Sequence, residues 1–120
     1  MNAAVRLGEA LASFLRAYEA QPELVAEQRG WSPVIALGAS DEPARVTVAL
    51  MDGCVSRVDH GATSATPATL EITADLCTLC DVLELRRDPN EPYLFGELTV
   101  AGPEADFMRL DYIASRLCAR

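Results

Sequence analysis

The stretch RVTVALMDGCVSRVD, residues 45–59, decides the fold of this 120-residue chain. It consists of two apolar runs that are joined by an Asp-Gly pair at 52–53. Asp-Gly between runs of β-forming residues is a strong hairpin signal, because both residues tolerate a positive φ. In the first run Val46, Val48 and Leu50 are two residues apart, so their side chains share one face of a strand. The stretch therefore predicts a β-hairpin with one buried face.

Three further segments have strand character. SPVIALG (32–38) is a short apolar run that begins with Ser-Pro and ends at a glycine, and TLEIT (69–73) and GELTVAG (96–102) repeat the alternation of the hairpin. With the two strands of the hairpin they predict five short strands. We expect these strands to form a mostly antiparallel sheet.

Helical patterns precede, interrupt and follow these strands. Pro22 opens a short helix, and residues 74–85 and the segment from Pro103 have helical spacing as well. The N-terminal segment has its apolar residues at helical spacing, at Leu7, Leu11, Phe14, Leu15 and Tyr18. We therefore expect an α+β fold with three or four helices on one face of the sheet.

The length and the hydrophobic content of 50% fit one domain over residues 1–120. Within it we expect N-terminal helices in 1–30, the sheet with an inserted helix in 31–102, and a C-terminal helix in 103–120. The last helix has more apolar surface than one sheet face needs, which indicates either a dimer interface or an internal cavity. Its buried stripe is predicted at Phe107, Leu110, Ile113 or Ala114, and Leu117, with Met108 and Tyr112 beside it.

The charge composition argues against several classes of partner. The formal net charge is -8, and all ten basic residues are arginine. Such a domain repels nucleic acid and anionic membrane surfaces, so neither is an expected partner. No apolar run reaches the ~20 residues of a membrane span, and the N-terminus lacks a signal-peptide core. We expect a cytoplasmic protein with reduced thiols, and the arginine bias suggests a GC-rich bacterial genome.

Three motifs in this order resemble the sterol carrier protein (type 2) domain family. They are VTVALMDGCV (46–55), TLEITADLCTLCDVL (69–83) and FGELTVAG (95–102), and the resemblance extends from about Trp31 to Leu117. It implies an apolar tunnel between the sheet and the later helices. It also implies that the tunnel holds a lipid, sterol-like or isoprenoid molecule. The segment LELRRDPNEP (83–92) departs from the family, which commonly has a glycine soon after the apolar helix.

The hypothesis that we favour is therefore a small binding protein, a carrier or accessory factor, without catalytic residues. Burial of an apolar ligand contributes roughly 25 cal/mol per Å² of area removed from water, so few polar contacts are needed. The candidate ligand-binding residues are apolar or adaptable side chains of the later helices: Leu76, Leu79, Cys80, Leu83, Phe95, Phe107, Met108, Tyr112 and Ile113.

The motif CTLC (77–80) allows three interpretations. A zinc site would need a second close pair of ligands, and the other cysteines and the one histidine are scattered singly. A redox role for Cys77 in the first helical turn is opposed by Asp75 and Asp81, which raise a thiol pKa. Cys80 has the helical spacing of a core residue. We therefore interpret the motif as apolar lining and expect no metal and no cofactor.

Four other residues have candidate functional roles. His60 follows Asp59, but no partner nucleophile is evident, so we interpret it as a solvated turn residue. Arg86 and Arg87 lie in an acidic loop that could recognise a carboxylate or phosphate head group at a pocket mouth. Trp31 is interpreted as core packing, with a lid over the cavity as the alternative.

Two other functions are kept open. An enzyme of the cyclase or isomerase type could use the same enclosed pocket, because a dry pocket needs only one or two placed polar groups. The residues that could serve such a reaction are Tyr93, Tyr112, Cys80 and Asp111. The third hypothesis is an interaction module that forms a homodimer through its apolar helices and binds no ligand.

Overall fold

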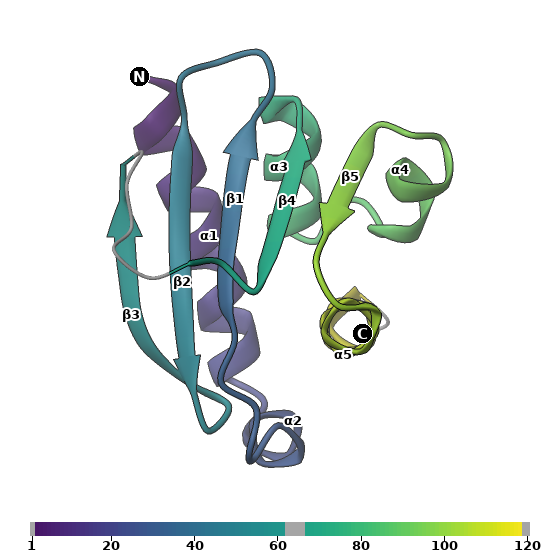
Figure 1. Ribbon diagram of the computed structural model, residues 1–120. Coiled ribbons are helices and arrows are strands. Elements are labelled where there is room, and N and C mark those ends of the chain that lie inside the picture. Colours follow the sequence, from purple (N-terminus) through teal and green to yellow (C-terminus); the bar gives the residue numbers. More distant parts are fainter. Residues whose placement is uncertain (1, 62–66, 119–120) are drawn as a thin grey trace.

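Five strands form one sheet in the spatial order β3-β2-β1-β4-β5 in the computed structural model, which describes residues 2–61 and 67–118 (Figure 1). All five predicted strands are therefore present. Their bounds are β1 (Val34–Ala39), β2 (Arg45–Met51), β3 (Cys54–His60), β4 (Leu70–Ala74) and β5 (Leu98–Ala101).

The hairpin predicted from residues 45–59 is confirmed. Strands β2 and β3 pair antiparallel, and the two residues between them have positive φ, 55° at Asp52 and 82° at Gly53. This is the turn geometry that matches the natural twist of two antiparallel strands. The hydroxyl of Tyr18 donates a hydrogen bond to the Gly53 carbonyl, which ties the turn to the N-terminal helix.

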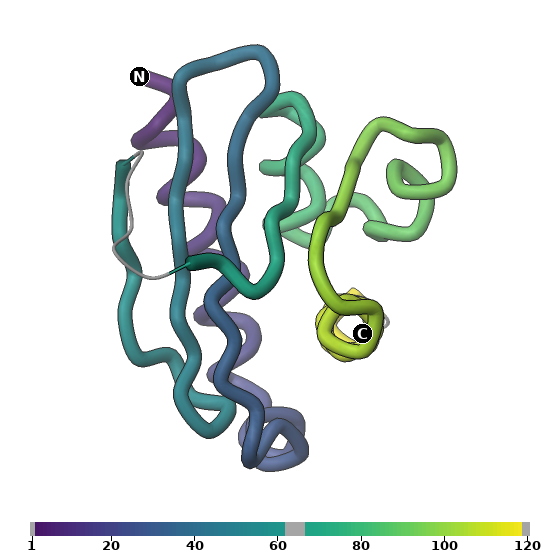
Figure 2. Tube along the Cα trace, viewed as in Figure 1, coloured from purple at the N-terminus to yellow at the C-terminus, as the bar shows by residue number. Residues whose placement is uncertain are grey.

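The sheet is mixed, not purely antiparallel. Strand β1 pairs antiparallel with β2 but parallel with β4, in the register Ile35 opposite Leu70. Parallel neighbours cannot be joined by a tight turn, and here the chain visits β2 and β3 before it reaches β4. Figure 2 shows the traces of β1 and β4 side by side.

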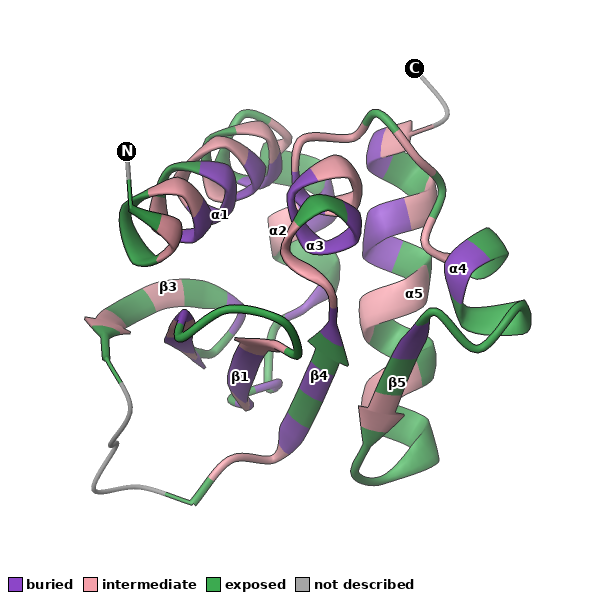
Figure 3. Cartoon of the chain, turned by 90° about the horizontal axis from the view of Figure 1, so that it is seen from above, coloured by how far each residue is buried: buried purple, intermediate pink, exposed green. Residues whose placement is uncertain are grey.

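The described residues contain five helices, one more than the upper end of the predicted number. They are α1 (Ala3–Glu19), α2 (Pro22–Glu27), α3 (Leu76–Leu83), α4 (Asn90–Leu94) and α5 (Glu104–Cys118). The additional helix is α4, one short turn in the proline-containing segment after α3. Helices α1 and α3 lie next to each other on one face of the sheet, and α5 lies beside them (Figure 3).

Helix α3 begins directly after Asp75, whose side chain caps its first turn. The Asp75 carboxylate accepts hydrogen bonds from the Thr78 backbone N–H, at 3.1 Å, and from its hydroxyl, at 2.6 Å. These bonds satisfy donors that the first turn of α3 leaves free, and they lower the pKa of Asp75. They also give the buried hydroxyl of Thr78 its hydrogen-bond partner.

The hydrophobic core lies between the helices and the inner face of the sheet. In β4 the side chains of Leu70, Ile72 and Ala74 are buried and the intervening ones are exposed, so one face of this strand is covered and the other meets solvent. Leu7, Leu11 and Phe14 of α1 and Leu79 and Leu83 of α3 pack against that inner face. The prediction of helices on one face of the sheet is thus confirmed.

Candidate functional site

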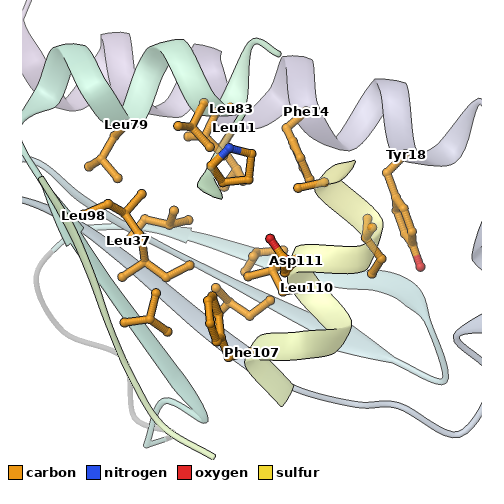
Figure 4. Close-up of a pocket in the computed structure, with 18 of the residues that line it drawn as sticks. Leu11, Phe14, Tyr18, Leu37, Leu79, Leu83, Leu98, Phe107, Leu110 and Asp111 are labelled. Carbon is orange, nitrogen blue, oxygen red and sulfur yellow. The ribbon is translucent and has the colours of Figure 1, made fainter. Parts of the chain in front are cut away.

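An apolar cavity lies between the inner face of the sheet and the helices α1, α3 and α5 (Figure 4). It encloses about 90 Å³. Helix α1 contributes Leu11, Phe14, Leu15 and Tyr18; α3 contributes Leu79, Val82 and Leu83; α5 contributes Phe107, Leu110, Asp111, Ile113 and Ala114; the sheet contributes Ile35, Leu37, Val48, Leu50, Ile72, Leu98 and Val100; and Trp31, Pro89 and Tyr93 complete the lining.

The lining makes the cavity unfavourable for water. An internal water needs two to four polar partners, and almost every atom of this wall belongs to hydrocarbon or aromatic rings. A dry cavity of roughly 150 Å³ holds benzene in another protein. The present cavity therefore has room for less than one small ring, and a larger apolar molecule requires that the wall move outward.

Four of the predicted ligand-binding residues line the cavity. Leu79 and Leu83 reach it from α3, and Phe107 and Ile113 reach it from α5. Each pair lies one or two turns apart on the buried stripe of its helix, as the sequence spacing indicates.

The structure places the other five outside this cavity. Cys80 is buried near Arg6 of α1, and burial raises the pKa of its thiol. Leu76 lines a separate hollow of the surface together with Ala3 and Pro43.

Phe95, Met108 and Tyr112 are surface residues, with exposed fractions of 74%, 61% and 42%. Phe95 follows the last residue of α4, where the chain has left the helix. Met108 and Tyr112 are four residues apart and share the outer face of α5, while its other face covers the cavity. The hydroxyl of Tyr112 donates to the Glu27 carboxylate at 3.2 Å, which holds it on that outer face.

Sequence reasoning did not assign a wall of the cavity to α1. Leu11, Phe14, Leu15 and Tyr18 all line it, and their helical spacing marked them as buried. Spacing shows that a helix has an apolar face, but it does not show which other elements that face meets.

Trp31 is buried and lines the cavity as well. Its indole Nε1–H donates to the Asp106 carboxylate at 2.7 Å, and the Arg109 guanidinium lies 5.5 Å from the ring centroid. Arg109 also donates to the side-chain oxygen of buried Gln28, at 2.9 Å. These contacts fasten α5 to the segment before β1.

Three polar side chains reach the cavity wall. Tyr18 already donates to the Gly53 carbonyl, and burial raises its pKa to about 12. The Tyr93 ring packs against the Phe107 ring, with centroids 4.9 Å apart. The Asp111 carboxylate has no hydrogen bond or ion pair within the part of the chain that the structure describes. Burial, and to a smaller extent the charge of Asp88, raise the pKa of Asp111.

The two loop arginines are occupied by protein carboxylates. Arg86 pairs with Asp81 at 2.7 Å and with Glu84 at 2.6 Å. Arg87 pairs with Glu91 at 3.2 Å and with Glu97 at 3.0 Å. Neither arginine belongs to the lining of the cavity, so the predicted head-group contact would need these pairs to open.

The remaining candidate groups lie apart from one another. Cys77 is exposed and Cys80 is buried, so the two cysteines of CTLC point in different directions. His60 lies against α1 at Gly8, and Asp59 pairs with Arg57 at 2.8 Å. Among residues 2–61 and 67–118, no three His, Cys, Asp or Glu side chains are grouped so that they could hold a metal ion. In the same residues, no helix is long and apolar enough to cross a bilayer.

Solved structures with this fold include several sterol carrier proteins. The sterol carrier protein domain 2 of Helicoverpa armigera has a TM-score of 0.72 and 13% identity, over 96% of this chain and 90% of that one. A crystal structure of sterol carrier protein 2 has a TM-score of 0.65 and 22% identity, over 92% of both chains. Palmitated SCP2L2 from Aedes aegypti has a TM-score of 0.61 and 14% identity, over 85% and 91%. The chain thus has the fold of the sterol carrier protein 2 domain.

The same fold occurs as part of a larger enzyme. The stereoselective inverting sec-alkylsulfatase Pisa1 from Pseudomonas sp. matches 76% of this chain with a TM-score of 0.59 and 13% identity, but the chain spans only 14% of the sulfatase. No protein-family model matches the sequence, and no curated protein matches it significantly.

Proposed function

We propose that this protein binds one hydrophobic molecule, of lipid, sterol-like or isoprenoid type, in the cavity between its sheet and α1, α3 and α5. The observation that carries the proposal is a dry interior space whose wall is contributed by four separate parts of the fold and is almost wholly apolar. A well-packed core leaves few voids larger than a water molecule, so a space of this kind needs a reason.

Removal of the ligand's apolar surface from water would drive such binding. Each Å² of apolar ligand surface removed from water contributes roughly 25 cal/mol. The wall must widen to admit a lipid, because the cavity encloses only about 90 Å³. On the side of the cavity formed by Tyr93 and Phe107 the covering helix α4 has only five residues, and Tyr93 is 42% exposed although it lines the cavity. We therefore propose that the ligand enters between α4 and α5.

The names of structural neighbours support this class of ligand. Three of the neighbours with this fold are sterol carrier proteins, and one of those was solved with palmitate. Because their identities to this chain are 22% or less, these neighbours support only the fold. The apolar wall of the cavity supports the proposal that this chain also binds a lipid-like molecule.

Titration of the indole fluorescence tests the proposal, because Trp31 is the one tryptophan and lines the cavity. With 1-dodecanol, dodecanoate and farnesol as probes, we expect at least one to change the emission saturably at equimolar stoichiometry. Hexane-1,6-diol, which has little apolar surface to bury, is the control and should leave the spectrum unchanged. If none of the three probes changes the emission and none is bound in equilibrium dialysis, the proposal fails.

A second candidate is an enzyme that uses the same pocket. It is favoured by one observation: a carboxyl group with a raised pKa, Asp111, lines a dry cavity together with Tyr93. A carboxyl group of this kind is suited to moving a proton within a bound apolar substrate. Conversion of an isoprenoid or sterol-like compound, lost in Asp111→Asn while binding persists, would favour the enzyme over the carrier.

A further inference from the structure

Asp111 differs from every other residue of the cavity wall. It is the one charged side chain in the lining, where it is surrounded by hydrocarbon and aromatic groups. Figure 4 shows it extending from α5 among Leu11, Leu110 and Phe107. A bound apolar molecule would therefore meet one carboxyl group and few other polar atoms.

The carboxyl group is without a partner in the described structure. The residue five positions earlier on the same helix, Asp106, accepts a hydrogen bond from the Trp31 indole at 2.7 Å. The Asp111 carboxylate makes no hydrogen bond or ion pair with any residue in 2–61 or 67–118. Its neighbourhood disfavours the charged form, since burial and the Asp88 carboxylate both raise the pKa of Asp111. A partially buried acceptor without a donor is stabilised by any ligand that brings one.

No cation is available at the cavity wall to receive an anionic ligand. The wall contains neither arginine nor lysine. The nearest arginine on α5 by sequence, Arg109, is bound to Gln28 and lies over the Trp31 ring. Arg87, from the loop before α4, is paired with Glu91 and Glu97. A carboxylate ligand would be repelled by the charge of Asp111, and no cation of the wall would offset this repulsion.

We propose that Asp111 selects the polar end of the ligand: it accepts a hydrogen bond from a hydroxyl group, so the cavity takes long-chain alcohols in preference to fatty-acid anions. This inference rests on the proposed binding function. It specifies the ligand class as an apolar chain or ring system that ends in a hydrogen-bond donor.

The test compares 1-dodecanol with dodecanoate, which have the same chain length, by isothermal titration calorimetry near neutral pH. Any apolar pocket prefers the alcohol to some extent. The informative quantity is therefore the affinity for dodecanol divided by the affinity for dodecanoate, and how this ratio changes on mutation. In Asp111→Leu we expect the ratio to fall by about tenfold, the effect of one hydrogen bond to a charged group. In Asp111→Asn, which keeps the shape and hydrogen-bonding capacity, dodecanoate binding should tighten while dodecanol binding changes by less than about threefold.

The control is Glu104→Gln, which removes a carboxylate from the exposed first turn of the same helix. It should leave the ratio unchanged. If both probes bind the wild-type protein but neither Asp111 variant alters the ratio, the inference about Asp111 is overturned and the binding function stands. If neither probe binds the wild-type protein, the inference about Asp111 falls, and the binding function falls with it only if farnesol does not bind either.

Discussion

Ala114→Phe is expected to weaken the binding of 1-dodecanol by more than about tenfold. Ala114 is 6% exposed and lines the cavity from α5. The substitution adds one phenyl ring, which is more than the cavity of about 90 Å³ has room for. A ligand chain would then have to displace packed side chains, which costs about 1–3 kcal/mol in an overfilled core. Calorimetric titration of the variant measures the loss.

Met108→Phe is the matched control for this substitution. Met108 lies on the same helix but on its exposed face, outside the cavity. It should bind dodecanol as the wild-type protein does. Equal affinities for Ala114→Phe and Met108→Phe, with both variants folded, would show that the ligand does not occupy this cavity.

Gly102→Ala is expected to destabilise the fold by about 3 kcal/mol. Gly102 joins β5 to α5 with a φ of 144°, a conformation that side chains rarely adopt. A Cβ atom there would lie 2.8 Å from Cδ2 of Leu70 and closer still to the Thr69 carbonyl oxygen. Because one of these neighbours is backbone, relief requires a shift of β4 against the start of α5. Urea unfolding, followed by the fluorescence of Trp31, measures the change in the free energy of unfolding.

Gly96→Ala separates the steric effect from the conformational one. Gly96 also has a positive φ, 76°, but no heavy atom lies within 4 Å of a Cβ built there. We expect a cost of about 1 kcal/mol, from the backbone conformation alone. If the two alanine variants were equally destabilised, the close approach of Thr69 to Gly102 would not constrain the fold.

Local signals explain why much of the fold could be predicted. The hairpin of β2 and β3 depends on Asp52 and Gly53, which are adjacent in the chain. The parallel pairing of β1 with β4 joins residues 35 positions apart, such as Ile35 and Leu70, and no local pattern records it. Helix α4 was missed because five residues around a proline give no periodicity to detect.

The candidate site was predicted less completely for a related reason. A 3.6-residue period identifies the buried face of α3, but it does not distinguish Leu79, which faces the cavity, from Cys80, which lies near Arg6 of α1. On α5 the spacing places Met108 beside the buried stripe that contains Phe107, and the packed structure shows that Met108 lies on the outer face of the helix. The isolation of Asp111 depends on neighbours from several elements, so it has no signature in sequence.

If this chain holds a hydrophobic molecule in its interior, the purified protein should carry that molecule with it. Identifying the bound compound is the most direct test. The protein would be purified without detergent, denatured in organic solvent, and the released compounds identified by mass spectrometry. The account predicts an apolar compound that ends in a hydroxyl group, at close to one equivalent in the wild-type protein and depleted in Ala114→Phe. A protein that releases no such compound, and that also fails to take up dodecanol, dodecanoate or farnesol, would contradict it.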